Sequence, residues 1–511
     1  MTPARRLAIA GASTLALYVA YFYVPLSVGH TVPIFDIHPL GTWSIGPAAG
    51  VAAFLAAIWA ALFAAYAAGY RGIRRSAREG EETEEAVRKR VYLFAAAATV
   101  LLVFLPSLLS KDVFDYIVQG RLLAIQRVNP FTVPADRFPR DEFVRAMGWP
   151  QFTTLYGPGW VSTAGILAFV SPSTLAGSVV VYKLLFALAH LLNGALVGAI
   201  RKGWGLRALE GEILYLWNPL ILTQVAGDAH NDVFLMMWVL LGLFFWQRAS
   251  SLGAGFERVL GVVCLSVSVL IKYVTAPFLL LALAKTVMSR RDLKGFAAAS
   301  GLALVAAAIA ALGFLPYLRG MDPLAILRPY QMGHYQGGVL MVLSMAASRV
   351  FPSGSAELSA SASRLLGAVS LGLTALLALW AGLLALRARR DEDVARSGLL
   401  ILLPYLLVVT ALLRVSYGVW LVAVAALLAA GPSRRAALLF SASLGALEIY
   451  WVYAIRMTGE VPSLHREQAA ATVVAVAIPI SYLLAVRLSA RARRVRAGAT
   501  RRGGPRPDES D

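Results

Sequence analysis

Long apolar runs recur along almost the whole chain, and they restrict its fold more than any other feature does. Of the 511 residues, 59% are hydrophobic and only 15% are charged. A helix crosses the hydrocarbon core of a bilayer in about 20 residues, and apolar runs of about 17 to 25 residues recur here. Soluble domains do not show this pattern. The sequence therefore predicts an all-α fold, a polytopic transmembrane helical bundle.

The apolar runs give about 14 candidate spans, and totals of about 12 to 15 fit the pattern. Several runs are short, which predicts tilted or broken helices. Two further apolar stretches, 158–171 and 337–350, are so short that each could cross the membrane or be re-entrant. The candidate spans are 7–26, 46–69, 91–109, 177–200, 212–226, 231–247, 259–271, 274–287, 296–315, 364–386, 397–412, 415–431, 436–455 and 469–487.

Lysine and arginine gather in alternate loops, which predicts the orientation of the bundle. Cytoplasmic loops of membrane proteins carry an excess of these residues. We therefore expect a multi-pass protein of the plasma membrane with both termini in the cytoplasm. The basic segments are 5–6, 71–90, 201–207, 290–294, 387–396, 434–435 and the C-terminal tail, and the loops expected on the opposite side are 27–45, 110–157, 227–230, 316–363 and 456–468.

The net charge of +19 follows the same loops and the tail. Basic residues placed there set topology and contact anionic lipid headgroups. The expected partner of this charge is thus the lipid bilayer and not a nucleic acid.

A first acidic patch, Lys111-Asp112-Val113-Phe114-Asp115-Tyr116, follows a long apolar run. Asp112 and Asp115 are three residues apart, so on a helix they share a face. Two carboxyl groups so close can have separated pKa values, with one of them poised as a base. Tyr116 and Arg121 follow in the same segment. The alternative is that Ser110 or Asp112 caps a helix leaving the membrane.

A second patch, Gly227-Asp228-Ala229-His230-Asn231-Asp232, lies on the same predicted side. Asp228 and Asp232 are four residues apart and also share a helical face. Helix capping by Asp228 or Asn231 is again the alternative. A zinc site would need a second histidine, and none is near in the sequence, so we expect no metal and no cofactor.

Cationic and aromatic residues on the same side could bind an anionic headgroup. Lys272 interrupts a long apolar stretch, where it either contacts a phosphate or extends its amine to the membrane surface. Tyr156 precedes Gly157 and Pro158, a turn at the start of an apolar run. The other candidates for substrate binding are Arg319, Arg328, His334, Arg414 and Tyr417.

The order of these motifs resembles the superfamily C (GT-C) integral-membrane glycosyltransferases. Within them the chain is most similar to the polyprenol-phosphomannose-dependent alpha-1,6-mannosyltransferase family of actinobacteria. The resemblance covers about 90–490 and rests on the order and loop placement of the motifs. These are Asp112-Val-Phe-Asp-Tyr, Gly120-Arg121, Asn129-Pro130-Phe131, Tyr156-Gly157-Pro158, Asn218-Pro219-Leu220 and Gly227-Asp-Ala-His-Asn-Asp232.

The resemblance implies a GT-C-like bundle with a long extracytoplasmic catalytic loop, a polyprenyl-phosphate sugar donor and inversion at the anomeric carbon. By position, Asp112 matches the catalytic acidic residue of the family, whereas Asp115 stands where relatives often have a non-acidic residue. The expected organisation is N-terminal spans with a basic cytoplasmic loop over 1–90, a catalytic membrane domain over 91–488 and a disordered basic tail over 489–511.

These expectations together describe a membrane glycosyltransferase. It would transfer a sugar, mannose by resemblance, from a polyprenyl-phosphate donor to a glycan or glycolipid acceptor of the cell envelope. The site would be extracytoplasmic, and a carboxylate would act as the base. The alternatives are a transporter or flippase of an anionic substrate, and a glycan polymerase or ligase that uses a pyrophosphate donor.

Overall fold

The structure is a computed structural model and describes residues 3–28, 45–79, 83–105, 110–252, 255–320, 337–351, 359–451 and 465–502. The regular elements in these residues are helices, joined by turns and loops. The helices are α1 (Pro3–Val28), α2 (Ile45–Glu79), α3 (Glu84–Val103), α4 (Asp112–Ala124), α5 (Glu142–Ala146), α6 (Pro158–Val170), α7 (Leu175–Gly203), α8 (Ala208–Leu216), α9 (Pro219–Leu222), α10 (Asp232–Leu252), α11 (Gly255–Ile271), α12 (Ala276–Arg290), α13 (Leu293–Phe314), α14 (Val339–Val350), α15 (Ala360–Ala385), α16 (Asp391–Pro404), α17 (Gly418–Leu427), α18 (Pro432–Ser443), α19 (Gly445–Trp451) and α20 (His465–Arg502).

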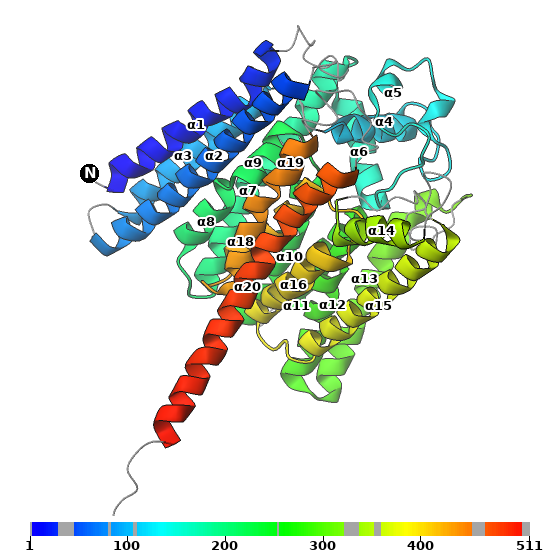
Figure 1. Cartoon of the computed structure of the whole chain (residues 1–511). Coiled ribbons are helices and arrows are strands. Elements are labelled where there is room, and N and C mark those ends of the chain that lie inside the picture. The colour runs from blue at the N-terminus through cyan, green and yellow to red at the C-terminus, as the bar shows by residue number, and fades with distance from the viewer. Residues whose placement is uncertain are drawn as a thin grey trace, which may run out of the picture.

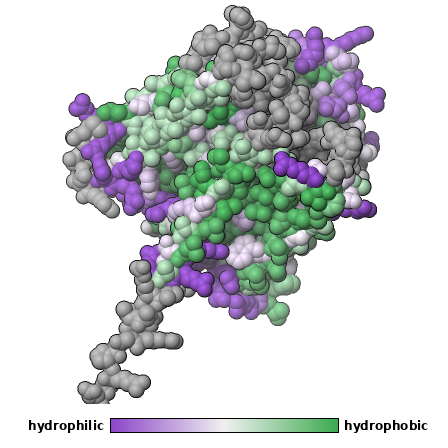
Figure 2. All heavy atoms as spheres, viewed as in Figure 1, coloured by the Kyte–Doolittle hydropathy of each residue, from purple (hydrophilic) through white to green (hydrophobic). Residues whose placement is uncertain are grey.

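The long helices run side by side as a bundle, and α4, α5 and α6 form a layer at one end of it (Figure 1). Helices α7, α8, α10 and α17 pack on one another in the middle, and α1, α2 and α3 lie together at one side. Figure 2 shows an apolar band across this face of the molecule, with hydrophilic residues gathered beyond it towards the ends. This pattern matches helices that are surrounded by lipid.

The basic turns meet at the end opposite α4, which we call the basic end. Arg434 donates to Tyr70 at 2.6 Å and pairs with Glu210 at 3.0 Å, and Arg201 pairs with the same Glu210 at 3.0 Å. A second contact at this end joins Lys285 of α12 to Asp391 of α16. The predicted grouping of the basic loops is therefore present in the structure, and their cytoplasmic location stays a prediction from charge.

Six of the described helices are long and apolar enough to cross a membrane, so the chain is a polytopic membrane protein. The predicted total of about 14 spans is not confirmed, because other predicted spans correspond to shorter or interrupted helices. The six are Ala49–Arg75, Leu175–Gly203, Asp232–Ser250, Leu293–Tyr317, Ala360–Ala385 and Gln468–Arg493.

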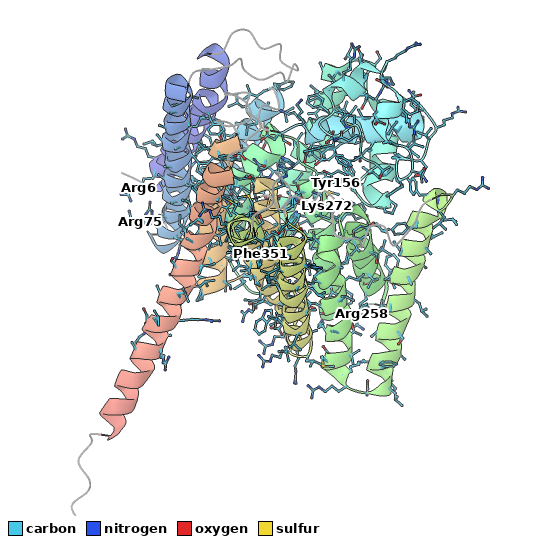
Figure 3. All side chains as sticks on the ribbon, turned by 45° about the vertical axis from the view of Figure 1, so that its right-hand side comes forward. Arg6, Arg75, Tyr156, Arg258, Lys272 and Phe351 are labelled. Atoms are coloured by element: carbon cyan, nitrogen blue, oxygen red, sulfur yellow. The ribbon has the colours of Figure 1, made fainter. Side chains whose placement is uncertain are left out.

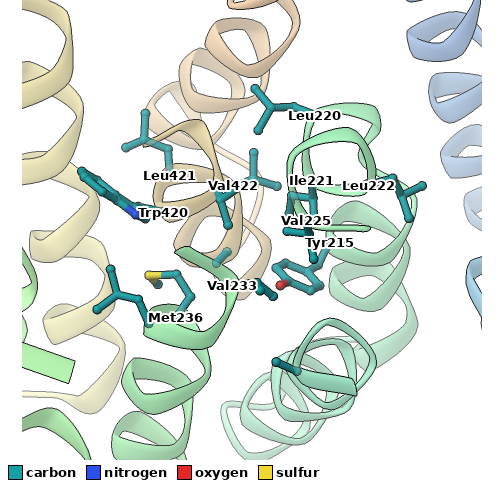
Figure 4. Close-up of a cluster of buried hydrophobic side chains, with 14 of the residues drawn as sticks. Tyr215, Leu220, Ile221, Leu222, Val225, Val233, Met236, Trp420, Leu421 and Val422 are labelled. Carbon is teal, nitrogen blue, oxygen red and sulfur yellow. The ribbon is translucent and has the colours of Figure 1, made fainter. Parts of the chain in front are cut away.

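The predicted span 212–226 is one such interruption. Helix α8 ends at Leu216, and Asn218 then caps α9 by accepting from the amide of Leu220 at 3.1 Å. Pro219 occupies the first turn of α9, where its missing N–H costs nothing. The π-helical turn η2 (Thr223–Gly227) follows directly. Side chains of this broken segment form a buried cluster with α10 and α17 (Figure 4).

The short apolar helix α6 lies entirely at the α4 end. It spans 13 residues, about 20 Å, which is less than the thickness of the hydrocarbon core. The amide of Gly157 donates to Ile271 at 3.1 Å, and a side chain at 157 would collide with the carbonyl of Leu270. The two possibilities for 158–171, crossing and re-entrant, both stay predictions.

The C-terminal helix differs from its prediction. The sequence predicts a disordered tail from 489, but α20 continues as a helix to Arg502. The residues that extend it are mainly alanine and arginine, which have high helix propensity. The residues after Arg502 lie outside the described part of the chain.

Candidate active site

Asp112 stands at the first position of α4, at the exposed side of the layer formed by α4 and α6. Ser110 accepts from the amide of Asp112 at 3.1 Å, so Ser110 supports the helix start and leaves the Asp112 carboxylate available. Gly120 lets α4 approach α6 closely, because a side chain there would collide with the carbonyl of Ala164. The side chain of Asp112 is 34% exposed.

The second acidic patch forms a tight turn that faces Asp112. After the π-helical turn η2, Ala229 takes a positive φ of 58°, an uncommon conformation for a residue with a side chain. Such strain and π-helical turns concentrate at functional sites. The turn places His230 Nδ1 at 3.3 Å from Oδ2 of Asp112, an ion-pair distance without the alignment of a hydrogen bond.

The pKa values of Asp112 and His230 shift in opposite directions because of this contact. Burial favours the neutral carboxyl of Asp112 and would raise its pKa. The contact with His230, with smaller contributions from the charges of Arg414 and Lys272, outweighs burial and lowers the pKa of Asp112. Burial likewise opposes the charge on His230, and the Asp112 carboxylate outweighs it and raises the pKa of His230. Asp112 is thus an ionised carboxylate at neutral pH.

Asp115 is the opposite case on the same helix. Its side chain is buried, and its Oδ1 accepts from the amide of Gly148 at 2.9 Å. Burial, together with the negative charge of Asp112, raises the pKa of Asp115 to about 8. The two carboxyls therefore have separated pKa values, as their spacing predicts, and Asp115 holds its proton where Asp112 does not.

Lys272 reaches the same region from the connection between α11 and α12. Its Nζ lies 2.7 Å from Oδ1 of Asp232, a fully buried carboxylate that also accepts from the indole of Trp420 at 2.7 Å. The rings of Tyr156, Tyr417 and Trp420 lie 5.3, 5.8 and 5.9 Å from Nζ. Figure 3 shows Tyr156 and Lys272 beside each other where the α4–α6 layer meets the long helices.

Tyrosines join the two halves of this site. The hydroxyl of Tyr116 accepts from the backbone amide of Asn231 at 3.4 Å, and its ring packs edge-to-face on Tyr156 with centroids 5.2 Å apart. Tyr417 stacks on Trp420 with centroids 4.3 Å apart. A carboxylate, cations and aromatic faces thus converge at the α4 end, which is an arrangement suited to binding a sugar bonded to an anionic group.

Comparison with known proteins identifies the family. A family model described as "Alpha-(1->6)-mannopyranosyltransferase, N-terminal domain" matches residues 9–289, more than half of the chain. The chain belongs to this family. The match includes Asp112, His230 and Lys272.

Individual relatives align over shorter stretches. The chain is 25% identical to alpha-(1->6)-mannopyranosyltransferase A of Corynebacterium glutamicum over 181 residues, which is 35% of each chain. It is 26% identical to the B enzyme of the same species over 156 residues, 28% of this chain and 24% of that one. The A enzyme of Mycobacterium tuberculosis is 26% identical over 243 residues, 46% of this chain and 44% of that one. Each alignment spans less than half of the relative.

A solved structure with partial resemblance is the apo oligosaccharyltransferase of Archaeoglobus fulgidus. It has a TM-score of 0.36 at 16% identity and covers 77% of this chain and 55% of that chain. The same archaeal enzyme with an inhibitory peptide and a dolichol-phosphate gives a TM-score of 0.38 at 15% identity with the same coverage.

Most of the residues proposed from the sequence gather at this site, and some do not. Arg414 is half-buried and close enough to influence the charge of both Asp112 and Tyr417. Arg319 is exposed in the turn that follows α13 and Tyr317, where its carbonyl accepts from Asn129. Arg121 points elsewhere and pairs with Asp141 at 3.1 Å. Arg328 and His334 lie outside the described residues.

Asp228 lies behind the site and not on its surface. Its side chain is fully buried, and its charge acts on His230 and on the buried Lys183 of α7. Lys183 donates to the carbonyls of Leu102 and Leu105 at the end of α3, which fixes the chain that leads to α4. Asp228 therefore acts on the site through its buried charge and not by direct contact with a substrate.

Sequence reasoning left two contributors out of the predicted site. Trp420 donates to Asp232 at 2.7 Å; the sequence places it beside Arg414 and Tyr417 at the start of a predicted span, but it was not among the predicted site residues. Lys183 lies within a predicted span, and an ionisable residue there is by itself a sign of function or pairing. That signal was present in the sequence. Among the described residues, no three metal-binding side chains come together.

Proposed function

We propose that this protein transfers mannose from a polyprenyl-phosphate mannose donor to a glycan or glycolipid of the cell envelope. Membership of the mannosyltransferase family supports the reaction class. The single observation that carries the proposal is the Asp112 carboxylate at the start of α4, with His230 Nδ1 3.3 Å from its Oδ2. Transporters also use ionised carboxylates, so the family match and not the carboxylate separates this proposal from a transporter or flippase.

In the proposed reaction, an acceptor hydroxyl attacks the anomeric carbon of the donor while Asp112 takes the hydroxyl proton. The bond between the anomeric carbon and the phosphate oxygen breaks, and the electron pair leaves with the polyprenyl phosphate. Attack from the face opposite to the phosphate inverts the anomeric carbon. A base at this position contributes on the order of 10²- to 10⁴-fold to the rate.

Lys272 and Arg414 are proposed to stabilise the phosphate as it leaves. The ammonium group of Lys272 has three donors, and Asp232 occupies one of them at 2.7 Å. The remaining donors are available to phosphate oxygens. The aromatic rings of Tyr156, Tyr417 and Trp420 offer apolar faces for a sugar and shield the site from water. Charge stabilisation of this kind suits a monophosphate leaving group.

The active site is proposed to lie on the extracytoplasmic face of the plasma membrane. The α4 end is opposite the basic end, and basic loops mark the cytoplasmic side in membrane proteins. A lipid-linked donor supplies activated sugar on that face, where nucleotide sugars are absent. The donor's polyprenyl chain would remain in the bilayer beside the apolar band.

The test is a transfer assay with membranes that contain the protein and membranes that lack it. Polyprenyl-phosphate mannose, glucose and arabinose are supplied in parallel with an envelope glycolipid fraction. We expect protein-dependent incorporation from the mannose donor and release of polyprenyl phosphate in equal amount. Incorporation from none of the three donors, with correctly inserted protein, would reject the proposed function.

A further inference from the structure

A cavity of about 180 Å³ lies between α4, α6 and α7, and its lining includes neither Asp112 nor His230. Its walls include Ile117 and Arg121 of α4, Ser171 after α6, and Ser178 and Tyr182 of α7. Arg121 follows Asp112 by nine residues on one helix, so the two Cα atoms are about 13 Å apart. The cavity is therefore separate from the catalytic carboxylate.

Two residues of the cavity lining each have a buried polar atom without a hydrogen-bond partner among the described residues. The atoms are Nε of Arg121 and the hydroxyl of Ser171, and both are buried. Arg121 is otherwise held firmly, by Asp141 at 3.1 Å and by stacking on the ring of Phe143 at 3.8 Å. A buried donor without an acceptor is costly, which indicates that a ligand or water supplies one.

The charge around the cavity selects the kind of ligand. Arg121 is the charged residue of its lining, and α7 begins beside it, with Thr174 as the cap. The N-terminus of a long helix carries partial positive charge, which adds to the effect of the guanidinium. The volume is several times the ~30 Å³ of one water molecule. The guanidinium of Arg121 already pairs with Asp141, so an anion in the cavity would share it. A compact anionic group with several oxygen atoms would accept from both donors and lie at the N-terminus of α7.

The surroundings of the cavity are apolar and exposed. Ile125 is 49% exposed, Ile166 65% and Phe169 76%, and all three come from the helices that form the walls. Large apolar side chains exposed to this extent lie against lipid in a membrane protein. An anionic group that enters from this side would be carried by a lipid.

We propose that this cavity is a second phosphate-binding site, separate from the one at Lys272. Arg121 and Ser171 donate to the phosphate oxygens, and the N-terminus of α7 faces the same group. The neighbouring apolar surface favours the phosphate of an anionic lipid headgroup over free phosphate. Such a site would hold a lipid within about 13 Å of the candidate base. The inference does not depend on the proposed reaction.

The test measures amide hydrogen exchange of the full-length protein in a neutral maltoside detergent. Peptides covering 117–125 and 171–182 are followed before and after addition of phosphatidylglycerol or of inorganic phosphate. We expect slower exchange of these peptides with phosphatidylglycerol. Slower exchange with the lipid alone assigns a lipid headgroup, and equal slowing with inorganic phosphate assigns a free anion; both support a phosphate site.

Two variants separate binding from folding. Arg121→Gln removes the cation, and we expect the lipid concentration needed for half-maximal protection to rise about tenfold or more. Ala168→Leu fills the cavity and leaves the Arg121–Asp141 pair in place, and we expect it to abolish protection. Arg248→Gln is the control, since Arg248 also stacks on a phenylalanine but lies elsewhere. The proposal is overturned if neither ligand slows exchange, or if Ala168→Leu is protected like the wild type.

Discussion

His230 Nδ1 lies 3.3 Å from Oδ2 of Asp112, and the two residues come from segments far apart in the sequence. The contact exists because Ala229 adopts a left-handed conformation after a π-helical turn. It couples the charge of the candidate base to an imidazole whose pKa the Asp112 carboxylate raises. The first predictions follow from this pair.

Asp112→Asn should reduce sugar transfer on the order of 10²- to 10⁴-fold, because the amide cannot accept the acceptor's proton. The initial rate is measured with saturating donor at matched expression. Asp115→Asn is the matched control, since Asp115 is buried and already protonated at neutral pH, and it should keep most of the activity. Near-normal transfer by the Asp112 variant would move the base to another residue.

His230→Gln should shift the acidic limb of the pH–rate profile to higher pH. His230 lowers the pKa of Asp112, so its removal raises that pKa and the base is protonated at a higher pH than before. The limb of the wild type lies below the ordinary pKa of an aspartate, so the profile of kcat/KM is recorded from the lowest pH at which both proteins stay folded up to pH 8. A uniform loss of rate with an unmoved limb would show that His230 acts in another way, such as substrate contact.

Lys272→Gln should lower both stability and donor use. Asp232 is fully buried, and loss of its partner leaves an uncompensated charge that costs about 3–5 kcal/mol. The double variant Lys272→Gln with Asp232→Asn removes both charges, so it should recover the unfolding midpoint but not the transfer rate. If the double variant regains transfer as well, Lys272 serves only to neutralise Asp232. Arg414 would then be the candidate residue for contact with the donor phosphate.

Asp115 should make the protein less stable as pH rises from about 4 to 8. The pKa of Asp115 is raised to about 8 in the folded protein, so the folded state holds a proton that the unfolded state has released in this window. Stability is full below the ordinary pKa of an aspartate and is lost as pH approaches 8. Thermal midpoints in detergent at pH 5 and pH 8.5 measure it, and Asp115→Asn should reduce the difference.

The two ends of the bundle should label from opposite sides of the membrane. Single cysteines at Arg137 and Arg75, both exposed, are introduced with Cys264 replaced by serine. An impermeant maleimide added to intact cells should label position 137, and position 75 should react only after permeabilisation. The reverse pattern would place the Asp112 site in the cytoplasm and remove the basis for a lipid-linked donor.

The sequence by itself determined the class of fold and the polar segments that matter. Runs of apolar residues leave a helical bundle as the solution in lipid, because every backbone polar group must be paired within the chain. Charged residues at such positions persist where they are paired or used, which marked Asp112, His230, Asp232 and Lys272. These inferences need only composition, spacing and the cost of burying charge.

Only the tertiary structure decided which of these residues act on one another. Sequence spacing could pair Asp112 with Asp115, but the turn between η2 and α10 brings His230 to Asp112 as its partner. In the folded chain Lys272 pairs with Asp232, and Arg121 pairs with Asp141 at its own cavity. Contacts between distant segments depend on helix positions in three dimensions, which no local periodicity contains. The sequence therefore predicted which kinds of residue form the site, and the contacts among these residues came only from the tertiary structure.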